Sequence, residues 1–372
     1  MSSRLKFIDR MSQGKISRRD MLRASAAFGV GMIALPRLAL AEELTVLEWS
    51  GYDSESYCQP FLSKYGKLPN FSIFAAEEDA LQKVLGGFSA DLMHPCNYSV
   101  GRFVEAKLVK PIDTAKLSNW KDLFPALQTA KGVVENGEVV MAPADWGNSS
   151  IAYRPDLVEP DYAANESWGI FTDDRYAGKV AMSDNEVAVQ ICGMLMGYTP
   201  DEAFHMEGAK LEAVKPLVEK VVKNSRFLWN DATEINQGLA SGEIVAAYAW
   251  NDTIKNLTKE GIKIAYAKPK EGYFTWFCGI TMLNKGKGDE AAAYDFVDAW
   301  LSPETGKNLI EGSGYGHSNV KAFEIADKAA VAAMGFTDPI EHMKSAILFP
   351  PLTGSSLAAQ IKLWEETKAL KQ

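Results

Sequence analysis

The sequence has few cysteines and histidines, and neither kind is spaced for a metal site. Its four cysteines are far apart with no C-x-x-C pair, and none of its four histidines stands at ligand spacing from another. Zinc sites need such closely spaced ligands. We therefore expect no metal, no cofactor and no disulfide framework, although an oxidising compartment would permit a single bridge.

Long apolar runs, repeats and catalytic motifs are also missing. No run of 18 or more apolar residues occurs, so we expect no membrane span in the mature protein. No period of 20–50 residues stands out, which excludes a solenoid or a propeller. The glycine-rich phosphate loops, the nucleophile elbow and the zinc-protease motif are absent. The sequence therefore favours a protein that is not an enzyme.

The first 41 residues have the three parts of an export signal. A basic stretch leads to the pair Arg18-Arg19, an apolar segment runs from Ala24 to Leu35, and Ala39-Leu40-Ala41 follows. Paired arginines before an apolar dipeptide are typical of twin-arginine signals, and small residues at alternate positions are typical of cleavage sites. We predict a signal peptide over 1–41, cleavage after Ala41 and a periplasmic location.

Removal of this segment would make the chain strongly acidic. The whole sequence has a formal charge of −9, and the first 41 residues contain eight Lys or Arg and two Asp, so the mature chain would carry −15. Nucleic acids need a cationic surface, and we expect no nucleic-acid partner. A negative field instead favours the capture of cations, although acidity also serves solubility alone.

The mature chain alternates short strands with helical segments, twice over. This alternation is typical of βαβ units with a mainly parallel sheet, and the length suggests two folding units. Extended segments at Val139–Trp146 and Phe277–Leu283 provide two crossings between the units. We predict an α/β fold of two lobes, lobe 1 from 42–145 and 276–320 and lobe 2 from 146–275 and 321–372, and a ligand cleft between them.

Ligands of open α/β sheets bind beyond the carboxyl ends of the strands, so the residues just after each strand are the candidates for a site. Five of the nine tryptophans fall at predicted strand ends or crossings. Tryptophan faces attract an ammonium group by about 0.5–2 kcal/mol each, and a carboxylate supplies the counter-charge. The pattern indicates a site for a small cation, although Asp184 and Asp252 could each serve only as helix caps.

The order of several short motifs resembles that of bacterial spermidine/putrescine-binding proteins. The motifs are Trp49-Ser50-Gly51-Tyr52, Ala90-Asp91-Leu92 with Tyr98, Tyr153 after Trp146-Gly147, Gly197-Tyr198, Trp250-Asn251-Asp252, Lys270-Glu271-Gly272 before Trp276, and the segment Gly312 to Asn319. The resemblance covers nearly all of the mature chain. It implies the type II periplasmic-binding fold, ligand capture between the lobes and delivery to the permease subunits of an ABC transporter.

The resemblance also suggests ligand-binding residues. They are Trp49, Ser50, Tyr52, Cys96, Tyr98, Asp184, Glu186, Trp229, Trp250, Asp252, Trp276 and Cys278. Three positions depart from the family: Gly51 and Cys278 replace acidic residues, and Val187 replaces a glutamate next to Glu186. A diamine needs a carboxylate near each end, because an unpaired buried ammonium costs several kcal/mol.

Together these observations predict a monomeric periplasmic binding protein for a putrescine- or spermidine-like amine. A zwitterion or quaternary ammonium, such as γ-aminobutyrate or a betaine, is an alternative ligand, although no arginine sits at a predicted cleft position. An exported enzyme is a second alternative. Iron capture by paired tyrosines is a third, but Tyr315 has no adjacent tyrosine.

Overall fold

The computed structural model of the protein describes residues 43–74, 77–334, 338–350 and 354–371. The described residues all belong to one compact unit. The predicted signal peptide at 1–41 lies outside the described residues. Within the described part we find no helix with the length and apolarity needed to cross a bilayer, and no cluster of side chains suited to a metal ion.

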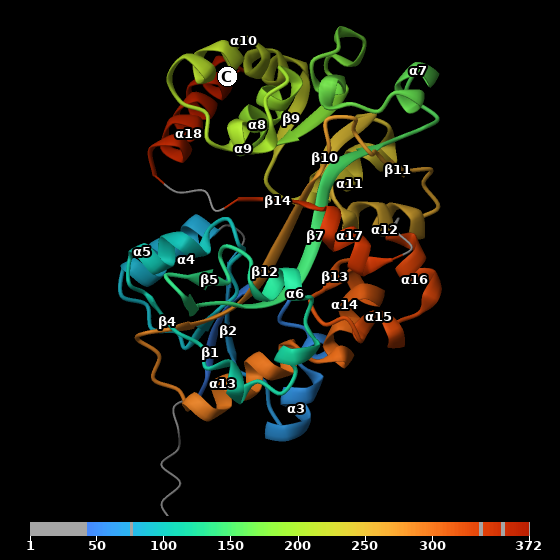
Figure 1. Ribbon diagram of the computed structural model, residues 1–372. Coiled ribbons are helices and arrows are strands. Elements are labelled where there is room, and N and C mark those ends of the chain that lie inside the picture. Colours follow the sequence, from blue (N-terminus) through green and yellow to red (C-terminus); the bar gives the residue numbers. More distant parts are fainter. Residues whose placement is uncertain (1–42, 75–76, 335–337, 351–353, 372) are drawn as a thin grey trace, which may run out of the picture. The chain divides into compact units, whose positions relative to one another are not determined.

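One large mixed sheet organises the described chain. Two long antiparallel strands, β7 (Ala142–Tyr153) and β12 (Phe274–Leu283), lie next to each other in its middle. The main path runs in the order β2-β1-β3-β12-β7-β10-β8-β9. Figure 1 shows β7 and β12 side by side between the two outer groups of strands. Both strands are buried along their whole length, as expected for segments covered on both faces.

The two outer groups of strands are parallel within themselves. On one side of the central pair lie β2 (Asn70–Phe74), β1 (Thr45–Trp49) and β3 (Leu92–Met93). On the other side lie β10 (Ala246–Trp250), β8 (Val180–Ser183) and β9 (Ser225–Trp229). Short strands pair with the central two: β4 (Val109–Lys110), β11 (Ala265–Tyr266), β13 (Gly316–His317) and β14 (Ile347–Leu348). β5 (Val134–Glu135) and β6 (Glu138–Val139) form a separate hairpin.

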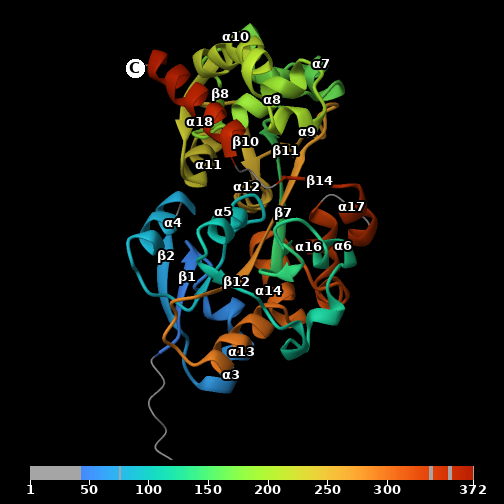
Figure 2. The same cartoon turned by 60° about the vertical axis from the view of Figure 1, so that its left-hand side comes forward.

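Helices cover both groups of strands (Figure 2). Near the first group and the neighbouring ends of β7 and β12 are α3 (Gln59–Tyr65), α4 (Glu77–Leu85), α5 (Val100–Glu105), α6 (Pro125–Gln128), α13 (Glu290–Trp300), α14 (Pro303–Ser313) and α15 (Ala322–Ile325). Near the second are α7 (Pro160–Ala164), α8 (Val187–Leu195), α9 (Pro200–Phe204), α10 (Gly208–Asn224), α11 (Ala232–Ser241), α12 (Asn251–Lys259) and α18 (Gly354–Lys368). Two further helices are α16 (Lys328–Ala333) and α17 (Pro339–Ser345).

The structure has the predicted alternation of strands and helices, and it also has short elements that were not predicted. The predicted α/β class is confirmed. The short strand β9 was not predicted, because its five residues follow directly on the long helix α10. α18 packs on α8 and α10, whereas α15 and α16, from the segment assigned to lobe 2, pack on α14. The lobe boundaries themselves remain a prediction.

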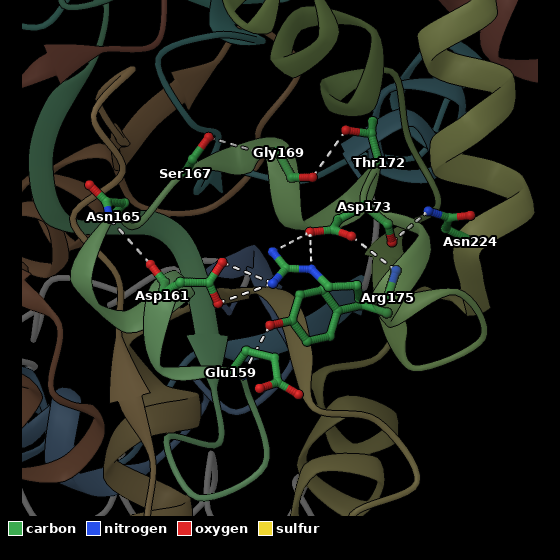
Figure 3. A network of polar contacts seen from close by, with 10 residues as sticks. Glu159, Asp161, Asn165, Ser167, Gly169, Thr172, Asp173, Arg175 and Asn224 are labelled. Carbon is green, nitrogen blue, oxygen red and sulfur yellow. Dashed lines mark hydrogen bonds and ion pairs between the residues drawn. The ribbon is translucent and has the colours of Figure 1, made fainter.

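An exposed arginine holds the loop before β8 in place (Figure 3). The Arg175 guanidinium bonds both carboxylate oxygens of Asp161, at 3.1 and 2.8 Å, and the Asp173 carboxylate, at 2.9 and 2.7 Å. The Asn224 amide donates to the Asp173 carbonyl at 3.1 Å and so fastens the loop to the end of α10. Because these charges face water, we expect each pair to contribute less than about 1 kcal/mol.

Candidate functional site

Most of the predicted site residues pack in or against one hydrophobic cluster, although they come from distant parts of the chain. Cys96, Trp229, Trp276 and Cys278 are buried members of this cluster, and Trp49, Tyr52, Tyr98 and Trp250 pack against it. Each follows a strand, ends one or lies in the long strand β12. The topology therefore gathers residues that are far apart in the sequence.

Two aromatic pairs belong to this cluster or pack against it. The Trp229 and Trp250 rings meet edge to face, with centroids 5.2 Å apart and planes at 83°. The Trp276 and Tyr315 rings meet in the same way, at 5.0 Å and 77°. Edge-to-face contact is a favoured geometry for aromatic rings. Trp229 and Trp250 end the strands β9 and β10, which both flank β8.

A glycine in the central strand allows the Trp276 ring to lie against the backbone. A Cβ atom at Gly147 would stand 2.4 Å from Cζ2 of Trp276, far closer than non-bonded carbons approach. Gly147 and Trp276 are partners in the β7–β12 register. The sequence Trp146-Gly147 therefore fixes where the indole lies. Trp146 itself is fully buried and donates from Nε1 to the His317 carbonyl at 3.0 Å.

Asp252 is the carboxylate next to the aromatic pairs. It lies in the first turn of α12, which starts directly after β10 without a connecting loop. Burial raises the pKa of Asp252 above its ordinary value, and hydrogen bonding with the Tyr315 hydroxyl opposes this only in part. The Oδ1 atom is buried and has no hydrogen-bond partner among the described residues. A buried carboxylate oxygen without a partner is an expected feature of a site for a cation.

Three of the predicted tryptophans share this property. The indole nitrogens of Trp49, Trp229 and Trp276 are buried and have no hydrogen-bond partner within the described ranges. Native proteins satisfy most buried polar atoms, so each exception calls for an explanation. These donors and the Asp252 oxygen belong to the residues that the sequence assigned to ligand binding. They fit a polar ligand or ordered water that contacts several of them.

A second group of carboxylates lies near Tyr98. Burial raises the pKa of Glu186, and its charge contributes to the raised pKa values of Tyr98 and Tyr248. Glu77 is buried at the start of α4, and burial raises its pKa to about 7 despite hydrogen bonds from Ser99 and the Cys96 backbone. Two carboxylates with raised pKa values thus flank Tyr98. A cation bound nearby would stabilise their charged forms.

Tyr52 belongs to a buried charge network. Its hydroxyl donates to Asp145 Oδ2 at 2.9 Å, and its ring stacks on Trp300 with centroids 5.7 Å apart. His94 bridges Asp145 and Glu48 through both ring nitrogens, at 2.8 Å each. Burial alone would lower the pKa of His94, but the charges of Glu48 and Asp145 outweigh it and raise the pKa to about 10. This network fixes the Tyr52 ring at the edge of the aromatic cluster.

The carboxylate of Asp184 has its partners on the helix α18. Its carboxylate accepts from Trp364 Nε1 and Lys368 Nζ, both at 2.9 Å, and so connects the end of β8 to α18. Burial opposes ionisation, but the hydrogen bonds from Lys368 and Trp364 hold the pKa of Asp184 below its ordinary value. Ser50 is exposed, and its backbone N–H donates to the Phe74 carbonyl at 3.2 Å. The ligand roles of both remain predictions.

Cys96 and Cys278 form a disulfide across 182 residues of sequence. It connects the loop after β3 to the central strand β12, where the register with β7 shifts at Cys278 and Gly279. The isolated bridge between the two cysteines places them side by side. Cys58 and Cys192 are buried free thiols. The sequence allowed for a single bridge but did not identify the pair.

Three residues of this region were not predicted from the sequence: Glu77, Asp145 and Tyr315. Tyr315 lay in the Gly312–Asn319 segment that the resemblance includes, and Asp145 directly precedes the crossing motif Trp146-Gly147. Position in these two motifs was therefore a usable signal. Glu77 follows β2 by three residues and carries no distinctive motif. Its contact with the loop at Cys96 depends on the tertiary fold.

Comparison with known proteins identifies the family. The family of bacterial extracellular solute-binding proteins matches the chain over residues 74–335, which is more than half of its length. The chain belongs to this family. The resemblance noted from the sequence motifs is thereby confirmed.

Individual relatives of this solute-binding protein agree with the assignment. The putrescine-binding periplasmic protein SpuD of Pseudomonas aeruginosa is 24% identical over 344 residues, which cover 88% of this chain and 92% of the relative. The putrescine-binding periplasmic protein PotF of Escherichia coli is also 24% identical, over 80% of this chain and 83% of the relative. Among solved structures, a putative spermidine/putrescine ABC transporter protein from Listeria monocytogenes has a TM-score of 0.75. It is 22% identical, and the alignment covers 88% of this chain and 99% of that chain. The type II periplasmic-binding fold is therefore confirmed.

Proposed function

We propose that this protein is the periplasmic capture component of an ABC importer for a small cationic amine of the putrescine or spermidine class. The observation that carries the proposal is Asp252, a half-buried side chain whose Oδ1 atom is buried and has no partner among the described residues, and which lies next to Tyr315. A primary ammonium group donates three hydrogen bonds and carries the charge that this oxygen lacks. Putrescine is named in the descriptions of both curated relatives, which supports this ligand class.

The two groups of carboxylates suggest how a diamine would be held. One ammonium group would pair with Asp252, and the other would lie near Tyr98, where Glu186 and Glu77 supply negative charge. The rings of Trp49, Trp250 and Trp276 would enclose the methylene chain and add cation–π attraction. Burial raises the pKa of both Asp252 and Glu186, so binding of a dication would favour their ionised forms.

The names of the two curated relatives cited above do not favour the alternative ligands. Both curated relatives carry putrescine in their names, and neither carries γ-aminobutyrate or a betaine. We likewise propose capture and release rather than turnover, as in other members of the solute-binding family. Delivery would be to the permease subunits of an ABC transporter, with the binding protein acting as a monomer.

We further propose export by the twin-arginine route, which rests on the sequence of residues 1–41 alone. Replacement of Arg18 and Arg19 by lysine keeps the charge and removes the paired guanidinium groups. If the route is correct, the unprocessed variant will accumulate inside the cell, whereas the parent protein will be found shortened in the periplasmic fraction. Equal export of both proteins would exclude the route.

The amine assignment can be tested by calorimetry with putrescine and spermidine. Trp250→Ala should weaken binding by about 1–3 kcal/mol through loss of ring contact and cation–π attraction. Trp120→Ala is a matched control, because Trp120 is also half-buried but packs near other clusters. Absence of any heat or thermal shift with either amine would refute the proposed ligand class.

A further inference from the structure

A cavity of about 440 Å³ lies behind the first turn of α12, and none of the predicted amine-binding residues lines it. Its walls come from α12, the segment from β11 to Tyr273, and the helices α14, α16 and α17. Figure 1 shows α12, α16 and α17 close together on one side of the molecule. A volume of this size is typical of sites for small organic ligands.

The charge of the lining is of one sign. Three lysines line the cavity, Lys255, Lys259 and Lys268, and no Asp or Glu is among its described lining residues. In the described part of the chain none of the three forms an ion pair with a carboxylate. The Lys255 ammonium donates instead to the backbone carbonyl of Glu311. Burial lowers the pKa of Lys255, and the charge of Lys259 lowers it further, whereas the charge of Glu311 opposes this shift.

Apart from the polar residues Asn148, Asn251 and Thr258, the rest of the lining is mainly apolar or aromatic. Ile254 and Ile310 come from the facing helices α12 and α14, and Ala330 comes from α16. The rings of Tyr273 and His342 lie nearly parallel, with planes at 18° and centroids 6.3 Å apart. Burial lowers the pKa of His342, and the charge of Lys268 adds to this effect. The cavity lining therefore contains both apolar or aromatic side chains and lysine ammonium groups.

We propose that this cavity is a second binding site, for a small organic anion with an aromatic or branched apolar body and one carboxylate. The carboxylate would face Lys259 and Lys268, and the apolar body would lie against Ile254 and the Tyr273 ring. The contrast with the whole chain supports an anion, since the protein carries a net charge of −9. Although the chain is acidic, three lysines and no carboxylate are found among the described lining residues. The cavity is therefore locally complementary to negative charge.

The position of the cavity connects it to the amine site through one helix turn. Asn251 lines the cavity and accepts a hydrogen bond from the Asn148 backbone at 2.5 Å, while the adjacent Asp252 belongs to the aromatic side. This part of the argument rests on the proposed amine function. An anion in the cavity would contact the same turn of α12 that positions Asp252, so we expect the two ligands to alter each other's affinity reciprocally.

The test uses 3-phenylpropionate as the probe, its uncharged amide as the isostere and inorganic phosphate as a bare anion. Calorimetry of the mature protein should detect saturable binding of 3-phenylpropionate, with the amide and phosphate weaker by at least about tenfold. The double variant Lys259→Ala/Lys268→Ala should lose at least about tenfold in affinity for the carboxylate. Ala330→Trp, which fills the cavity, should abolish binding.

Lys263→Ala/Lys270→Ala is the matched control, because it removes the same charge from exposed lysines outside the lining. The proposal is overturned if either the amide or inorganic phosphate binds as tightly as 3-phenylpropionate. It is also overturned if the control variant loses as much affinity for 3-phenylpropionate as the Lys259/Lys268 variant. Each variant is also titrated with putrescine. If the protein binds putrescine but not 3-phenylpropionate, only the second site is refuted. If it binds 3-phenylpropionate but not putrescine, only the amine function is refuted.

Discussion

Replacement of Asp252 by asparagine separates the roles of charge and shape at the proposed amine site. Asparagine keeps the size of the side chain and an oxygen that can accept from Tyr315, but it removes the negative charge. A bound ammonium would then be buried without a counter-charge, which costs about 3–5 kcal/mol. We expect putrescine affinity to fall by roughly 150- to 4,000-fold.

The thermal stability of the unliganded protein should not fall with this substitution, in contrast to its affinity for putrescine. Burial raises the folded-state pKa of Asp252 above its ordinary value. Ionisation of Asp252 therefore reduces the stability of the free protein as the pH rises from the unfolded-state pKa to the folded-state pKa. An asparagine side chain has no such ionisation. At pH 7 the unliganded Asp252→Asn protein should therefore unfold at the same temperature as the parent protein or a higher one, while the stabilisation by putrescine is lost.

The assay combines calorimetry with thermal unfolding, with and without putrescine. Asp79→Asn serves as the control, since Asp79 is an exposed acid in the first turn of α4 and the substitution changes the net charge equally. A loss below tenfold for Asp252→Asn would refute the role of this carboxylate. A lower melting temperature without ligand would refute the claim that burial of the charge destabilises the free protein.

Three further outcomes are expected from other parts of the region. Gly147→Ala should displace the Trp276 ring, because a Cβ would lie 2.4 Å from it, and lower the free energy of unfolding by about 1–3 kcal/mol. Glu77→Gln should make the free energy of unfolding less dependent on pH. Burial raises the pKa of Glu77 to about 7, so the free energy of unfolding of the parent protein should fall by about 3 kcal/mol as the pH rises from roughly 4.5 to 7. Replacing Cys96 and Cys278 by serine should remove as much as about 5 kcal/mol, because the bridge closes a loop of 182 residues.

Each of these outcomes has its own control. Urea titration of Gly169→Ala, where the added Cβ meets a side chain at 3.2 Å, should show a smaller loss than Gly147→Ala. Melting curves from about pH 4.5 to 7.5 that run parallel for the Glu77→Gln and parent proteins would contradict the burial argument. A reductant should lower the urea midpoint of the parent protein but leave the double serine variant unchanged, since Cys58 and Cys192 are already free thiols. If the reductant lowers the urea midpoint of both proteins, loss of the disulfide is not the cause of the destabilisation.

The sequence by itself determined the local elements and the chemical character of the site. The alternation of strand-like and helical patterns predicted an α/β fold, because these patterns depend on near neighbours in the chain. The motifs after the strands identified Trp250 and Asp252 for the same reason: strand ends can be read locally, and ligands of α/β sheets bind beyond them.

Only the tertiary structure decided which of these residues meet. Asp184 stands after a strand just as Trp49 and Trp250 stand at strand ends, yet Lys368 of the last helix neutralises it, and no local pattern indicates a partner 184 positions away. The pairing of Cys96 with Cys278, and the placement of Glu77 behind Cys96, likewise depend on strand order. Burial and long-range partners arise from the packing of distant segments, and they decide which carboxylates remain available to a ligand.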